Sequence, residues 1–155
     1  MKYWLIKSEG ECYSIDDLAR DKRTPWEGIR NFQARNFMRD GMSVGDLVLF
    51  YHSNAKPTGV YGIARVASAA HIDESALNPK DEHFDPKAVK YVREGKEPLW
   101  VCVDMAFVKK LPHPFSLEDM KRQPRLQSML VLRRGQRLSV MPVAEEHFNI
   151  IVKRK

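Results

Sequence analysis

The 155-residue chain predicts a mixed α+β domain with a strongly curved sheet or small barrel at its centre. Several apolar runs have the length of strands, short helix patterns lie at the connections, and no regular βαβ alternation is present. Hydrophobic content of 43% and charged content of 30% are those of an ordinary globular protein. A chain of this length buries about two thirds of its unfolded surface without staples. We therefore expect one domain over residues 1–155.

The first strand and helix are predicted from short local patterns. Residues 3–7 alternate as a strand does and end in a turn composition. Ser14 precedes Asp17 by three residues, which is the spacing of a capping box at a helix start. Residues 47–52 form an almost unbroken apolar run and predict a buried strand. Residues 60–66 are its expected hairpin partner.

A second helix is predicted to begin at the N-cap residue Asn31 and to run to about Arg39. Gly41 would then end it in the left-handed conformation that glycine favours after a helix. Arg35 and Arg39 share one face, four residues apart. A different face carries the 3–4 residue spacing of a buried apolar stripe, at Ala34, Phe37 and Met38.

Residues 69–98 are polar and rich in turn residues, which predicts a long surface excursion with one short helix near 87–92. The remainder is predicted to contain, in order, a strand at 100–108, a short helix capped by Ser116, closing strands at 130–132 and 137–140, and a helix over about 144–152. No internal repeat, low-complexity segment or linker interrupts this order.

The chain carries a formal net charge of +6 and a pI near 9.4, which favours polyanionic partners. Cys12 and Cys102 form no CxxC motif and no zinc spacing, so we expect two free thiols and neither a metal nor a cofactor. No apolar run approaches the roughly 20 residues of a membrane helix, and the start does not match a signal peptide. We expect a cytoplasmic protein, or a nuclear one in a eukaryote.

Residues 24–56 combine three chemistries that a nucleotide requires together. Flat rings that could sandwich a base are supplied by Trp26, Phe32 and Tyr51. Donor and acceptor groups that could distinguish base edges are supplied by Asn31, Asn36, Ser53 and Asn54. Cations that could meet phosphate are supplied by Arg30, Arg35, Arg39 and Lys56. Trp26 stands out because it lies in a loop between Pro25 and Gly28, whereas Trp4 and Trp100 fall in strand patterns.

The chain resembles the EVE domain family over essentially its whole length. The matching segments are Trp4–Glu9, Pro25–Asn36, Val44–Asp46, Phe50–Asn54, and Arg137–Val140 with Pro142. The resemblance implies a PUA-like fold, which is a small mixed β-barrel with short flanking helices. It also implies a reader of a modified base, most of all a modified cytosine in DNA, that acts through an effector partner.

Carried over by this resemblance, the site has two parts. The base pocket would comprise Ser8, Trp26, Asn31, Phe32, Tyr51, His52, Ser53, Asn54 and Ser139. The phosphate-binding residues would comprise Lys7, Arg30, Arg35, Arg39, Lys56 and Arg137. Phe32 stands where tyrosine is common in the family, which removes one hydroxyl from the expected pocket.

Other functions remain open at this stage. An RNA reader would use the same chemistry as a DNA reader. A small-molecule enzyme could use the same cleft through Glu9, His52 and Ser53. Adjacent strand residues point to opposite faces, however, and no G-x-S-x-G elbow is present, so we predict no catalytic residue. A plain interaction module without a pocket beside Trp26 is the last alternative.

Overall fold

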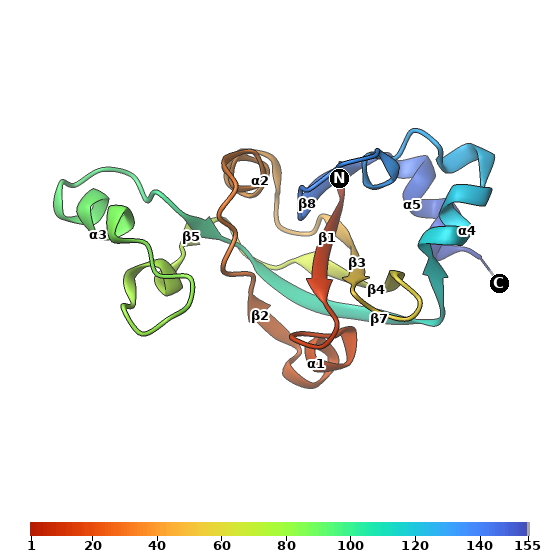
Figure 1. Ribbon diagram of the computed structural model, residues 1–155, viewed down its shortest axis with the longest axis horizontal. Coiled ribbons are helices and arrows are strands. Elements are labelled where there is room, and N and C mark those ends of the chain that lie inside the picture. The colour runs from red at the N-terminus through yellow and green to blue at the C-terminus, as the bar shows by residue number, and fades with distance from the viewer. Residues whose placement is uncertain (155) are drawn as a thin grey trace.

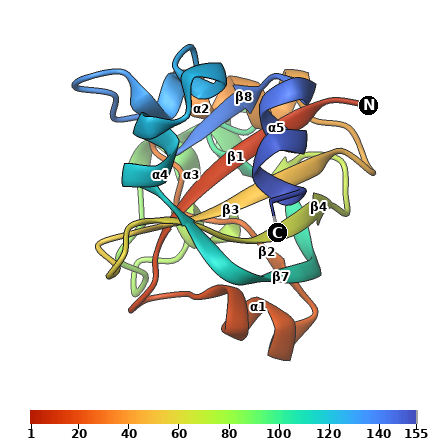
Figure 2. The same cartoon turned by 90° about the vertical axis from the view of Figure 1, so that its right-hand side faces the viewer.

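The computed structural model describes residues 1–154, and its centre is a six-stranded mixed sheet in the order β2-β7-β4-β3-β1-β8. Its strands are β1 (Tyr3–Glu9), β2 (Arg23–Pro25), β3 (Leu47–Ser53), β4 (Gly59–Val66), β7 (Asp104–Ser116) and β8 (Val140–Val143). Strands β1 and β3 pair in parallel and the other neighbours pair antiparallel. The sheet curls around the core as a half-barrel (Figures 1 and 2). The predicted α+β class with a curved central sheet is confirmed.

All the helices are short, and those outside the lobe described below lie at the ends and edges of this sheet (Figure 2). The helices are α1 (Ile15–Asp21), α2 (Phe32–Asn36), the π-helical turn η1 (Phe37–Gly41), η2 (Glu74–Leu77), α3 (Pro86–Arg93), α4 (Leu117–Arg122), η3 (Pro124–Leu126), η4 (Leu130–Leu132) and α5 (Glu145–Val152). The predicted capping box is confirmed: Ser14 Oγ accepts from Asp17 N at 3.1 Å, and Asp17 Oδ2 accepts from Ser14 N at 2.9 Å. Within residues 1–154, every helix is too short or too polar to cross a bilayer.

The predicted excursion forms a lobe beside the sheet, at the left of Figure 1. A two-stranded sheet of β5 (His71–Ile72) and β6 (Val101–Cys102) closes its base, and helix α3 lies where a short helix was predicted. The lobe has its own small hydrophobic cluster, built from Ala76, Ala88, Leu99 and Trp100. A cluster of four buried residues is small, so other contacts must hold the lobe against the main domain.

Asp73 provides these contacts. Its carboxylate is fully buried and forms an ion pair with Arg30 Nη1 at 2.9 Å. The same oxygen, Oδ2, accepts from the backbone N of Gly28 at 2.9 Å, while Oδ1 accepts from Ser75 N at 2.9 Å. Arg30 also donates to the carbonyl oxygen of His83 through Nη2 at 2.8 Å. These bonds, which we call the Arg30 clamp, hold the lobe against the segment that carries Trp26.

The second helix was predicted correctly at its start and wrongly at its end. Asn31 Oδ1 accepts from Ala34 N at 2.9 Å, as expected of an N-cap. Gly41, however, is the last residue of the π-helical turn and lacks the predicted positive φ. A Cβ at position 41 would lie 2.7 Å from Cη2 of Trp4. The glycine is there because Trp4 packs against its backbone.

Three strand predictions also differ from the structure. Residues 130–132 form a 3₁₀ turn, because three apolar residues are too few to fix a period. The closing strand β8 begins at Val140, where the prediction of 137–140 ended. Strand β7 extends eight residues beyond the predicted end at 108, through Pro112 and Pro114. Its pairing with β4 is irregular there, and such irregularities tolerate proline.

Candidate functional site

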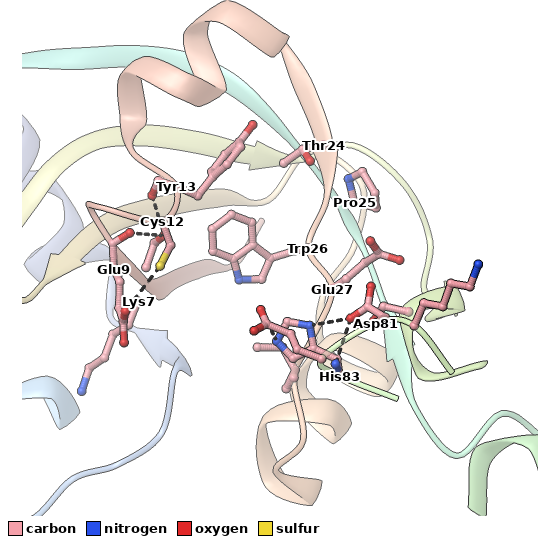
Figure 3. A pocket seen from close by; sticks show the side chains of 15 residues that line it. Lys7, Glu9, Cys12, Tyr13, Thr24, Pro25, Trp26, Glu27, Asp81 and His83 are labelled. Atoms are coloured by element: carbon pink, nitrogen blue, oxygen red, sulfur yellow. Dashed lines mark hydrogen bonds and ion pairs between the residues drawn. The ribbon is translucent and has the colours of Figure 1, made fainter. Parts of the chain in front are cut away.

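A cavity of about 1000 Å³ opens between the C-terminal end of β1, the segment that follows β2, and the lobe (Figure 3). This volume is at the upper end of the range for small-ligand sites. The lining residues are Lys7, Ser8, Glu9, Cys12, Tyr13, Thr24, Pro25, Trp26, Glu27, Ile29, Ser75, Lys80, Asp81, Glu82 and His83. Segments separated by more than fifty residues in the sequence therefore build one hollow.

Trp26 extends into the middle of this cavity (Figure 3). Its backbone N donates to the carbonyl oxygen of Val103 at 2.8 Å, and this bond holds Trp26 beside the N-terminal end of β7. Its ring packs edge-on against Phe50 at 5.5 Å and against Tyr13 at 6.0 Å, so the indole is 9% exposed and held on two sides. Trp26 therefore lines a cavity, as the sequence predicted.

The indole N–H of Trp26 is free to bind a ligand. No residue between 1 and 154 accepts a hydrogen bond from it, whereas Trp4 Nε1 donates to Asp46 at 3.0 Å and Trp100 Nε1 donates to Asp85 at 2.8 Å. Within the described residues, no fully buried side-chain nitrogen or oxygen lacks a partner. The Trp26 nitrogen is therefore accessible, and a ligand in the cavity can accept from it.

The cavity is acidic although the protein as a whole is basic. Four carboxylates line it, against the two ammonium groups of Lys7 and Lys80. Partial burial, followed by the nearby charge of Asp73, raises the pKa of Glu27. The imidazole of His83 lies between Asp81 at 3.2 Å and Glu82 at 3.7 Å. Such a lining disfavours phosphate inside the cavity and favours a ligand with N–H groups.

Several predicted site residues converge on the β1 side of the cavity. Lys7 and Ser8 line it directly. Ser8 Oγ donates to the carbonyl oxygen of Tyr13 at 2.6 Å, so this hydroxyl is already occupied in shaping the wall. Ser53 Oγ donates to the carbonyl oxygen of Ser8 at 3.3 Å, and Ser139 accepts from Lys7 N at 2.8 Å. Ser53 and Ser139 support this wall from behind.

Tyr51 lies beneath the same wall. Its ring is buried, with Lys7 Nζ 5.9 Å from the ring centroid. Burial raises the pKa of the Tyr51 phenol and lowers the pKa of the Lys7 ammonium. Tyr51 therefore backs the strand on which Lys7 and Ser8 lie, and it does not line the cavity, whereas Tyr13 does.

Four residues predicted to line the base pocket lie elsewhere, and one of them, Phe32, is exposed on the surface of α2. His52 is buried, accepts from Ile15 N at 3.1 Å and stacks on Tyr61 at 4.0 Å, so it belongs to the packing of α1 on the sheet. Asn54 is exposed at a turn with φ 53°. Asn31 is occupied as the N-cap of α2. None of these residues lines the cavity, and a contact between the Asn54 amide and a base stays a prediction.

The predicted phosphate-binding cations differ in how free they are. Arg30 is committed to the clamp described above, which corrects its assignment to phosphate. Arg39 is exposed and pairs with Asp40 at 2.9 Å. Arg35 donates to the carbonyl oxygen of Leu99 at 3.0 Å. Lys56 and Arg137 are exposed and remain predicted phosphate contacts.

The sequence prediction missed the acidic half of the cavity. Glu27 adjoins Trp26 and was available to the same argument, since a carboxylate accepts from base amino groups. The loop at 81–83 gave no local signal, because its approach to Trp26 depends on the path of the lobe. Tyr13 follows the turn after β1, where its ring could have been recognised as a second aromatic wall.

A Cys–His–Asp grouping lies outside the cavity and has structural character. His71 Nε2 lies 2.8 Å from Asp104, and Cys102 Sγ lies 3.6 Å from His71 Nδ1. Burial, followed by nearby carboxylates, raises the pKa of the Cys102 thiol to about 12. A nucleophilic cysteine needs the opposite shift. Among residues 1–154, no cluster of three or more metal-ligating side chains is found.

The position of His52 gives a first testable prediction. His52→Ala removes a buried ring that stacks on Tyr61 and accepts from Ile15 N, so we expect unfolding to become easier by about 1–3 kcal/mol. Urea denaturation measures this change. A variant of wild-type stability that has lost a catalysed reaction would contradict the structural role.

Comparison with known proteins places the chain in a family. The family model of the EVE domain matches residues 2–154. Mouse thymocyte nuclear protein 1 is 36% identical, with 97% of this chain and 72% of that protein covered. A hypothetical protein from Leishmania major superposes with a TM-score of 0.90 at 45% identity, covering 99% and 93% of the two chains.

A further solved structure is human THYN1 in complex with 5-methylcytosine-containing DNA. It superposes with a TM-score of 0.88 at 32% identity and covers 100% of this chain and 99% of its own. The half-barrel sheet with short helices is thus shared with THYN1, as the resemblance in the sequence implied. The chain belongs to the EVE domain family.

Proposed function

We propose that this protein reads a modified cytosine in DNA, held in the cavity around Trp26. The observation that supports it most is the accessible indole N–H of Trp26 inside a cavity whose charged groups are mainly carboxylates. A flipped base offers ring faces for stacking, acceptors for an N–H donor, and an amino group for a carboxylate. The cavity offers an aromatic ring, an N–H donor and carboxylates for these three interactions.

The chemistry fits cytosine in particular. Cytosine carries ring acceptors next to its exocyclic 4-amino group, so an indole N–H and a carboxylate together match its edge. Glu9 and Glu27 lie on opposite sides of Trp26 in Figure 3, and either carboxylate could accept from the amino group. A 5-methyl group buried in the cavity adds about 0.8 kcal/mol, or about fourfold in affinity.

The relatives support the same ligand. Human THYN1, which shares the fold over the whole chain, was crystallised with DNA that contains 5-methylcytosine. The net charge of +6 would draw the chain to DNA, while the acidic cavity would reserve its interior for the neutral base. The proposed reader performs no catalysis, because binding alone delivers the information. It acts as a single EVE domain over residues 1–155, in the compartment that holds the DNA.

Matched oligonucleotides test this function. Fluorescence anisotropy would compare one duplex with a single 5-methylcytosine, the same duplex unmodified, and the corresponding RNA with and without the methyl group. We expect the methylated DNA to bind several-fold more tightly than the unmodified DNA. A preference for methylated RNA would instead assign the cavity to RNA, and equal affinity for all four would contradict base reading.

A further inference from the structure

A second aromatic surface lies outside the cavity. Phe32, at the start of α2, is 56% exposed and stacks on Trp100, with ring centroids 4.9 Å apart and planes inclined by 19°. Trp100 is buried and fixed by its bond to Asp85. We call Phe32, Trp100 and Arg35 the stacking platform. An exposed aromatic ring supported by a rigid second ring is unusual for a residue that only completes a core.

The outer face of Phe32 is open. Arg35 Cζ lies 4.7 Å from the Phe32 centroid and 5.9 Å from the Trp100 centroid. If the guanidinium covered the outer face, its distance to Trp100 would approach the sum of the other two distances in this triangle. It is far shorter, so the guanidinium lies beside the two rings. The ring face that points away from Trp100 is therefore available to a planar ligand.

One guanidinium beside this open ring has no ion-pair partner in the described part of the chain. Arg35 donates to Leu99 O and to Asn36 Oδ1, and within residues 1–154 it forms no ion pair with a carboxylate. Burial, followed by the charge of Arg39, lowers the pKa of the Arg35 guanidinium, although the charge of Asp40 acts in the opposite direction. Arg30 lies under the platform, 5.4 Å from the Trp100 centroid. An open ring beside guanidinium groups suits a base with its phosphate.

The stacking platform and the cavity are separate sites. None of the three platform residues lines the cavity. Between them lies the Arg30 clamp, since Arg30 contacts Trp100 on one side and holds the backbone of His83, a cavity residue, on the other. A ligand on Phe32 is thus divided from a ligand on Trp26 by a layer of protein. One nucleic acid could occupy both if it is distorted or partly single-stranded.

We propose that the stacking platform binds a second, unpaired base of the bound nucleic acid, with the ring on Phe32 and its phosphate near Arg35. This rests on the proposed DNA binding and extends it from one base to two. None of the three platform side chains is an amide or a carboxylate, so the platform reads stacking and not base identity. It would accept the base left without a partner when the modified base enters the cavity, or an unpaired neighbour.

A single-stranded oligonucleotide without any modified base tests the platform alone. One position carries 2-aminopurine, a fluorescent adenine analogue whose emission is quenched by stacking. Phe32→Leu keeps apolar bulk and removes the ring, whereas Phe32→Tyr keeps the ring. Loss of a base stack worth about 1–3 kcal/mol lowers affinity about 5- to 100-fold. We expect that loss and reduced quenching for Phe32→Leu, with near wild-type behaviour for Phe32→Tyr.

The two proposals can fail independently. Wild-type affinity and quenching in Phe32→Leu, with thermal unfolding unchanged, would overturn the platform. The preference for methylated over unmodified duplex should survive Phe32→Leu, because the cavity is intact. If the methyl preference is absent in the wild type while Phe32→Leu still weakens single-strand binding, the platform stands and base reading in the cavity falls.

Discussion

Trp26→Ala is expected to abolish the preference for methylated over unmodified DNA and to weaken binding of the methylated duplex by about 5- to 100-fold. The reason is the loss of base stacking worth about 1–3 kcal/mol, together with the one accessible indole N–H of the cavity wall. Anisotropy titration of the two duplexes measures both effects. Because Trp26 also packs on Phe50, truncation costs about 3–5 kcal/mol of stability, and binding must be measured at a temperature where the variant is folded.

A matched variant separates stacking from hydrogen bonding. Trp26→Phe keeps an aromatic face and removes the N–H, so we expect part of the affinity to remain and the discrimination to fall. Trp4 is the wrong position for a control because its N–H is bonded to Asp46 in the core. Arg137→Ala is a better control, because removal of an exposed cation should lower the affinity for both duplexes equally. Retained methyl preference in folded Trp26→Ala would contradict the site.

Asp73→Ala is expected to lower the free energy of unfolding by about 3–5 kcal/mol. Its carboxylate is fully buried, so its removal leaves the Arg30 charge and the Gly28 N–H without their partner. Chemical denaturation measures the change. Asp40→Asn is the matched control, because the Arg39–Asp40 pair is exposed and should contribute little. Equal effects of the two substitutions would contradict the clamp.

The same carboxylate predicts acid sensitivity. Burial alone would raise the pKa of Asp73, but the hydrogen bonds from Ser75, Arg30 and Gly28 outweigh it and hold the pKa below its ordinary value. A depressed pKa in the folded state stabilises the protein above the ordinary aspartate value of 3.8, and this contribution is lost as pH falls toward the folded-state pKa. We expect the free energy of unfolding to fall below about pH 4 in the wild type, and less steeply in Asp73→Asn.

The parts of the fold that depend on local physics could be predicted from the sequence. An unbroken apolar run located β3, and side-chain caps located α1 and α2 at Ser14 and Asn31. The end of α2 could not be predicted in this way. The reason is that Gly41 is required by the Trp4 ring, which comes from a strand about 37 residues away in the chain.

The site was predictable in part for the same reason. Trp26 was located because its loop position frees its ring from the strand pattern. Neither His52 nor Asn54 lines the cavity, because β3 contributes no residue to its lining, and local sequence does not show which strands border it. The acidic wall at 81–83 depends on the Arg30 clamp, and a contact between residues 30 and 83 leaves no trace in local sequence. Tertiary contacts decided these positions.

The central claim is that the modified base contacts the indole of Trp26, and the indole N–H signals in a ¹H–¹⁵N NMR spectrum test it most directly. The three tryptophans give three such signals, and Trp4 serves as the internal control because its N–H already donates to Asp46 and it belongs to neither proposed site. Trp26→Phe identifies the third signal by its loss. Saturation with methylated duplex should shift the Trp26 signal strongly and the Trp4 signal hardly at all. An unmoved Trp26 signal in the presence of fully bound methylated DNA would contradict the account.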